Sequence, residues 1–124
     1  GCIAFSPLAQ GLLTNKYLNG VPKNSRAAAG DSFVQTMLSD ENIAHVRALN
    51  DIAQKRGQSL AQMAIAWILR DPRVTSALIG ARNLQQLDDS LDALKNQSFS
   101  TDELKLIDQY AREGHINLWR NLSE

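Results

Sequence analysis

The sequence has little cysteine, no net charge and no long apolar run. A single cysteine, Cys2, among 124 residues excludes an internal disulfide framework and a cysteine-rich metal site. Thirteen basic residues balance thirteen acidic ones, so no overall field attracts nucleic acid or an anionic membrane surface. The longest strictly apolar run, 63–69, is seven residues, whereas a membrane span needs about twenty. We therefore expect a cytoplasmic protein with neither a nucleic-acid nor a membrane partner.

Two common nucleotide-binding patterns are also absent from the sequence. It contains no GxGxxG and no GxxxxGK[ST], so neither a Rossmann nor a P-loop fingerprint is present. The two histidines, His45 and His115, have no second ligand at a metal-binding spacing. We expect no metal site, and solvated or capping roles for both imidazoles.

Two short apolar segments, 1–5 and 74–79, predict strands buried on both faces, as in a parallel sheet. Proline follows the first strand at Pro7 and disfavours its continuation. A loop of about thirty residues then follows, and loops of that length are usually functional or disordered. The first strand starts with the first residue, so we expect the chain to be part of something larger.

Four helices are predicted from caps and apolar periodicity. The first begins after Ser39 and ends near Gly57, and the second covers Leu60–Leu69 behind the capping box 59–62. A third follows the cap Asn83, and the fourth begins at 100–103 and stops near Gly114. The predicted inner stripe of the third helix consists of Leu84, Leu87, Leu91 and Leu94.

The order of these elements favours an α/β fold with parallel strands. Two strands alone cannot form a stable parallel sheet, because their edges and one face would stay open. We therefore expect further strands from outside this sequence.

The clearest candidate for chemistry is the turn 80–82, where the second strand runs directly into a helix. Free N–H groups and the positive end of a helix dipole bind anions, and Arg82 adds a charge suited to phosphate. The alternative is an ordinary helix cap beside a solvated arginine. Lys16 and Arg26 in the long loop are either further phosphate contacts or solvated cations. Tyr17 beside Lys16 has the composition of an acid–base pair, but adjacent loop residues need not face one site.

Two long motifs resemble one family. The segment 3–17, IAFSPLAQGLLTNKY, resembles the end of strand seven and the following loop of aldo-keto reductases. The segment 80–87, GARNLQQL, resembles their strand-eight cofactor motif. The apolar helix 60–69 and the tail 117–119 are similar to the branch that contains potassium-channel β subunits and bacterial L-glyceraldehyde 3-phosphate reductases.

The resemblance implies that residues 1–124 are the C-terminal part of a (β/α)8 barrel domain, with its last two strands and their helices, that binds NADPH. Ser6, Pro7, Leu8, Gln10 and Gly11 would line the pyrophosphate and nicotinamide side, and Lys16 and Arg26 would hold phosphates. Gly80, Arg82 and Gln86 would hold the 2′-phosphate end, with Asp89 and Ser90 near the adenine. Asn15, Arg82 and the pair Asp89-Ser90 depart from the family's usual residues. The change at Asp89-Ser90 shortens one side chain and replaces an amide by a hydroxyl at the expected adenine contacts.

The family's catalytic Asp, Tyr, Lys and His belong to earlier strands, and none of those positions falls in this sequence. We therefore expect the parent protein to reduce aldehydes or small ketones and this chain alone to be inactive. Two alternatives are an NADP-binding regulatory subunit resembling channel β subunits and a truncated product that needs a partner N-terminal half. A homo-oligomer is a further expected form.

Overall fold

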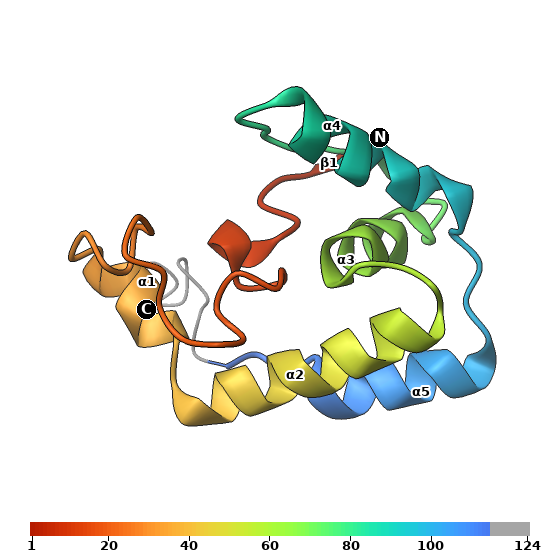
Figure 1. The fold of residues 1–124 in the computed structure, drawn as a ribbon. Helices are drawn as coiled ribbons and strands as arrows, with labels where there is room; N and C mark the ends of the chain where they lie inside the picture. The colour runs from red at the N-terminus through yellow and green to blue at the C-terminus, as the bar shows by residue number, and fades with distance from the viewer. Residues whose placement is uncertain (115–124) are drawn as a thin grey trace, which may run out of the picture.

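The computed structural model describes residues 1–114, apart from the side chain of residue 33 (Figure 1). In chain order its elements are β1 (Cys2–Ala4), η1 (Ala9–Gly11), α1 (Ser32–Met37), α2 (Asp40–Lys55), α3 (Leu60–Leu69), β2 (Val74–Ala77), α4 (Leu84–Leu91), η2 (Asp92–Lys95) and α5 (Thr101–Tyr110). The fold is mixed α/β, as predicted. The predicted tail, with His115 and Trp119, lies outside the described residues.

The two strands pair in parallel, which confirms the predicted pairing. Ala4 is opposite Ala77, and the N–H of Leu78 donates to the carbonyl oxygen of Ala4 at 2.8 Å. The predicted burial of both strands is wrong, because Ile3 is 67% exposed and Leu78 is 63% exposed. In the described part of the chain no third strand pairs with either edge, so much of this small sheet remains open.

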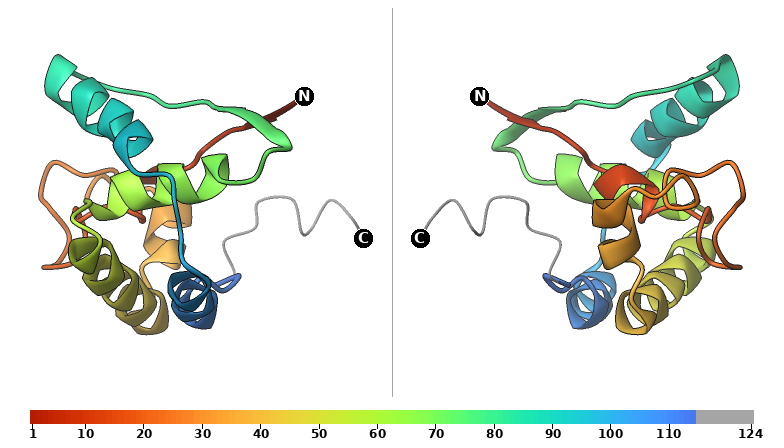
Figure 2. Two further views of the ribbon diagram at one scale, coloured as in Figure 1. Left: turned by 90° about the vertical axis from the view of Figure 1, so that its right-hand side faces the viewer. Right: turned by 90° about the vertical axis from the view of Figure 1, so that its left-hand side faces the viewer.

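The main core lies between α2, α3 and α5. Figure 2 shows α2 and α5 side by side, with α3 packed above them. Helix α2 contributes Val46, Leu49 and Ile52, whose spacing of three places them on one face. The predicted caps are confirmed: the Ser39 hydroxyl accepts from the N–H of Asn42, and capping boxes begin α3 and α5. Local sequence therefore sets where these helices start, and their apolar faces bring them together.

The predicted thirty-residue loop is more structured than expected. It contains η1 and α1, and Tyr17, Ala27 and Val34 form a second small core. Asp31 caps α1 by accepting from the N–H of Val34 at 3.1 Å. A helix of six residues is too short to show apolar periodicity, which explains why the sequence pattern missed it.

The predicted inward stripe of α4 is wrong. In α4, Leu84, Leu87 and Leu91 are exposed by 77%, 36% and 49%, and Leu94 in η2 is exposed by 54%. Helix α4 lies at the far end of the molecule from α2 and α5 (Figures 1 and 2), and α3 and β2 cover this row only in part, at a small cavity lined by Leu91 and Leu94. Periodicity tells which side chains share a helix face, but it does not supply the neighbour that would bury them.

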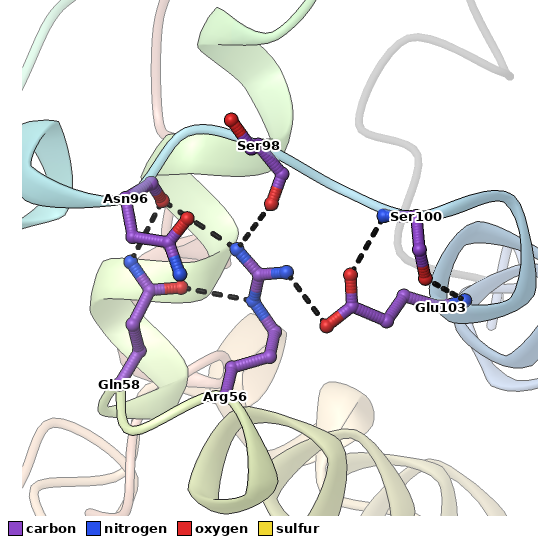
Figure 3. Close-up of polar contacts among 6 residues, drawn as sticks. All are labelled: Arg56, Gln58, Asn96, Ser98, Ser100 and Glu103. Carbon is purple, nitrogen blue, oxygen red and sulfur yellow. Dashed lines mark hydrogen bonds and ion pairs between the residues drawn. The ribbon is translucent and has the colours of Figure 1, made fainter.

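Arg56 fixes the connection between η2 and α5 to the corner between α2 and α3 (Figure 3). Its guanidinium donates to the carbonyl oxygens of Asn96 and Ser98 at 3.5 and 3.0 Å and to Oε1 of Gln58 at 3.0 Å. Nη1 of Arg56 is 2.9 Å from Oε1 of Glu103, and the guanidinium lies 3.8 Å from the ring centroid of Phe99. The extended segment between η2 and α5 is thus held by one buried cation.

Candidate cofactor-binding site

The two predicted cofactor segments begin at the same edge of the sheet. Ser6–Gly11 follows β1 and Gly80–Arg82 follows β2. Because β1 and β2 are parallel and Ala4 is opposite Ala77, both segments leave the sheet at the carboxyl ends of neighbouring strands. This is the edge at which parallel α/β sheets bind ligands.

The segment after β1 folds into tight consecutive turns. The N–H of Ala9 donates to the carbonyl oxygen of Ser6, and that of Gly11 to the carbonyl oxygen of Leu8, each at 3.0 Å. Ser6 and Gln10 have positive φ values of 51° and 59°, which are uncommon for residues other than glycine. Pro7 is buried and Leu8 is half-buried, so these two side chains anchor the turn. Backbone strain of this kind tends to occur at binding sites.

Arg26 joins this turn to the long loop. Its Nη1 donates to Oε1 of Gln10 at 2.5 Å, and its Nη2 lies 2.8 Å from Oδ2 of Asp31. The structure thus brings together two predicted site residues that are 16 positions apart. Asp31 is a partner that sequence reasoning missed, and the only local signal for it was its position as a helix cap.

Lys16 lies beside the same turn. A Cβ placed on Gly11 would be 3.8 Å from Cδ of Lys16, so the two residues are neighbours. The ammonium of Lys16 lies 5.5 Å from the ring centroid of Tyr17 and forms no ion pair within the described residues. Lys16 is therefore a cation able to approach an anionic ligand.

Tyr17 does not have the placement of a catalytic acid. Its side chain is only 3% exposed and its hydroxyl is buried without a hydrogen-bond partner. The ring packs with Ala27 and Val34, away from the solvent that a substrate would cross. The acid–base pair considered for Lys16 and Tyr17 has no support in this geometry.

The segment after β2 is organised by the start of α4. The side chain of Asn83 accepts from the N–H of Gln86, and Oε1 of Gln86 accepts from the N–H of Arg82, both at 2.9 Å. Gly80 and Arg82 are exposed, and the Arg82 guanidinium forms no ion pair in the part of the chain that the structure describes. Arg82 and Gln86 thus meet at a helix N-terminus, as the sequence predicted.

Asp89 and Ser90 turn toward α3 instead. Oδ1 of Asp89 accepts from Nε2 of Gln62 at 2.8 Å. Ser90 is 8% exposed and lines a small cavity of about 260 Å³ among α3, β2 and α4. Neither side chain hydrogen-bonds to the two strand-end segments within residues 1–114. Their predicted contact with adenine stays a prediction.

The residues at this edge suit a ligand that carries phosphates. Lys16 and Arg26 lie beside the turn after β1, and Arg82 lies beside the N-terminus of α4; cationic side chains and helix N-termini bind phosphate oxygens. Within residues 1–114, no group of three or more His, Cys, Asp or Glu side chains could hold a metal ion. The same region has no helix long and apolar enough to cross a membrane.

Comparison with known proteins identifies the family. Residues 1–112 match the model of the Aldo/keto reductase family. The chain belongs to this family. It is 52% identical over 128 aligned positions to L-glyceraldehyde 3-phosphate reductase of Escherichia coli O157:H7, covering 100% of this chain and 37% of that protein. The enzyme of the same name from strain K12 matches with the same identity and coverage.

A plant relative is a probable potassium-channel β subunit, the second kind of protein in the predicted branch. The chain is 39% identical over 97 positions to a probable voltage-gated potassium channel subunit beta of Oryza sativa subsp. japonica. That alignment covers 76% of this chain and 30% of the plant protein. The resemblance predicted from segments 3–17 and 80–87 is confirmed at the level of family and branch. The chain spans about a third of the length of these relatives, 37% of the two bacterial proteins and 30% of the plant protein.

Proposed function

We propose that this chain is the cofactor-binding C-terminal part of an NADPH-dependent aldo/keto reductase that reduces aldehydes or small ketones in the cytoplasm. The observation that carries the proposal is the shared edge of β1 and β2, where both cofactor motifs of the sequence begin. The name of the bacterial relatives, L-glyceraldehyde 3-phosphate reductase, supports an aldehyde as substrate.

The role of this chain is to bind and orient the cofactor. Lys16, Arg26 and Arg82 would neutralise phosphates, and the turn Ser6–Gly11 would lie against the nicotinamide side. NADPH, when bound, supplies the hydride for carbonyl reduction. Tyr17 would not donate the accompanying proton, because its hydroxyl is buried in the second core. Proton delivery would fall to the part of the reductase that carries the family's catalytic Asp, Tyr, Lys and His.

The open surface around the sheet supports a larger barrel. Ile3, Phe5 and Leu78 are each more than half exposed, at 67%, 59% and 63%, and the leucine row of α4 is also bare. Several large apolar side chains exposed near one small sheet favour an interface there. We propose that it packs against the other strands and helices of a (β/α)8 barrel, supplied by a longer chain or by a partner N-terminal half.

The alternative function is an NADP-binding regulatory subunit. The 39% identity to the plant channel β subunit favours this second candidate. Both candidates require the same cofactor site, so cofactor binding does not separate them. Turnover of an aldehyde by the complete barrel would support the reductase, whereas cofactor binding without turnover would support the regulatory subunit.

The cofactor site is tested by calorimetric titration of the chain with NADPH and, separately, with NADH. We expect tighter binding of NADPH, and a loss of about 10- to 100-fold for Arg82→Ala, because a charge-assisted hydrogen bond contributes about 1.5–3 kcal/mol. Binding of NADH by the same variant should change little.

Arg73→Ala is the matched control, since Arg73 is an exposed arginine at the other end of β2, paired with Asp71. It should bind NADPH as the unsubstituted chain does. Equal affinity for the two cofactors would refute the assignment of Arg82 to the 2′-phosphate. Binding of neither would refute the proposal that this chain carries the site by itself.

A further inference from the structure

An apolar groove of about 300 Å³ lies on the opposite side of α3 from the small cavity at Ser90. Its walls come from the turn at Pro7 and Ala9, from α2, from α3 at Met63 and Ala64, and from the end of α5. Several of its lining residues, among them Leu49, Leu60 and Met63, also belong to the main core, so the groove borders that core. An apolar groove of this size favours an apolar occupant, because its wall side chains otherwise lack van der Waals contacts on their open side.

Trp67 forms part of the apolar wall. It lines the groove and packs against the main core as a partly buried side chain. Its indole Nε1 is itself covered by protein and has no hydrogen-bond partner among the described residues, so this N–H is not a contact point for an occupant of the groove.

The chain leaves the described region from the wall of this groove. Gly114 lines it, and Nδ2 of Asn42, itself 7% exposed, donates to the Gly114 carbonyl oxygen at 3.0 Å. Gly114 has a φ of +55°, and a Cβ at this position would lie 2.6 Å from Oδ1 of Asn42. Both facts require glycine here, so the exit point of the chain is fixed at the groove.

We propose that the segment 115–124 of the same chain docks in this groove, with Trp119 against the face of α3 that carries Met63. Ten residues follow Gly114, and fully extended they would reach about 33 Å. The segment carries Ile116, Leu118 and Trp119, apolar side chains suited to the apolar walls. Its attachment to the wall also gives it a high effective concentration there, which no separate ligand has. The inference rests on the groove and not on the proposed cofactor site.

The two methionines of the chain provide a direct test. Both belong to the main core and are 3% exposed, but Met63 lines the groove and Met37 does not. In the chain labelled with 13C at the methionine methyl groups, we expect a nuclear Overhauser contact between the Trp119 ring and the Met63 methyl. Trp119→Ala should shift the Met63 resonance and leave that of Met37 in place.

A matched pair of substitutions tests the groove itself. Ala64→Arg places a charged side chain in the groove and should abolish the contact between Trp119 and Met63. Ala44→Arg makes the same change at an exposed position of α2 outside the groove, and should preserve that contact. Trp119→Ala lies outside the described core, so it keeps the test valid even where Ala64→Arg does not fold.

Three results would overturn the proposal. The first is an unchanged Met63 resonance in Trp119→Ala. The second is an equal shift of both methyl resonances, which would reflect a general loosening. The third is a Trp119–Met63 contact that disappears on dilution, because the occupant would then be the segment of a second copy.

Discussion

The pair of Arg56 and Glu103 gives the sharpest test of how this fold is held together. The Arg56 side chain is 2% exposed, and Glu103, which is 32% exposed, lies 2.9 Å from it. Glu103 has a second role, because its other carboxylate oxygen accepts from the N–H of Ser100 at 2.7 Å and completes the capping box of α5. Glu103→Gln keeps the size of the side chain but removes the negative charge beside a buried cation.

The expected loss is about 1–3 kcal/mol in the free energy of unfolding. Breaking a fully buried ion pair typically costs about 3–5 kcal/mol, because a charge is left buried without a partner. Here the loss is smaller, since Glu103 is partly exposed to solvent and Arg56 keeps its bonds to Gln58 and to two carbonyl oxygens. The glutamine also loses the charge that favours a helix N-terminus, an effect of about 0.3–1 kcal/mol.

Urea unfolding at pH 7 measures this loss, with Glu41→Gln as the control. Glu41 is an exposed glutamate in the first turn of α2, so the control removes a charge from a helix start without touching a buried arginine. A loss for Glu103→Gln no larger than for Glu41→Gln would show that the carboxylate does not stabilise Arg56.

The pH dependence of the same pair provides a second measurement. The hydrogen bond from the Ser100 N–H, and then the Arg56 guanidinium, hold the pKa of Glu103 below its ordinary value of 4.5. A lowered pKa means that the ionised form stabilises the fold above pH 4.5, and that this stability is lost as the pH falls through the lower pKa of the folded state. The difference in stability between the unsubstituted chain and Glu103→Gln should therefore narrow below pH 4.5. A difference that stays constant into acid would contradict this reasoning.

Two further predictions concern backbone strain and exposure. Gly114→Ala should destabilise the chain by about 1–2 kcal/mol from its positive φ alone, and by more from its approach to Asn42. Gly30→Ala, with a φ of +89° and open space around it, should show only the first effect, so equal losses in thermal unfolding would contradict the contact. Leu84→Glu should change stability by less than about 0.5 kcal/mol and reduce self-association in sedimentation. Leu49→Ala, at a core position, should cost about 2–5 kcal/mol in the same unfolding assay.

Much of the helical structure could be predicted because its signals are local. Ser59 with Gln62, and Ser100 with Glu103, form capping boxes between residues three positions apart, so the pattern of letters is enough to find them. Helix α1 could not be found in this way. Its six residues pack by means of Val34 against Tyr17, a contact that no short sequence pattern records.

The sequence predicted which residues belong to the candidate site, and the structure shows which of them contact one another. The sequence motifs identified Gln10 and Arg26 as candidate site residues. Only the folded loop shows that the Arg26 guanidinium donates a hydrogen bond to the amide oxygen of Gln10. The sequence predicted Asp89 as a site residue near the second motif. In the structure its carboxylate accepts a hydrogen bond from the side chain of Gln62 in α3. Long-range partners of this kind depend on how separate elements pack.

The sequence by itself determined where α2, α3, α4 and α5 start, the order of strands and helices, and the family, because each depends on short contiguous motifs. The tertiary structure decided which apolar surfaces are covered. The apolar side chains of α2 and the leucines of α4 both recur at helical spacing, yet Leu49 is 6% exposed and Leu84 is 77% exposed. The physical reason is that a side chain is buried only where a second surface packs on it: α2 packs against α3 and α5, whereas the described elements leave most of the leucine row of α4 exposed.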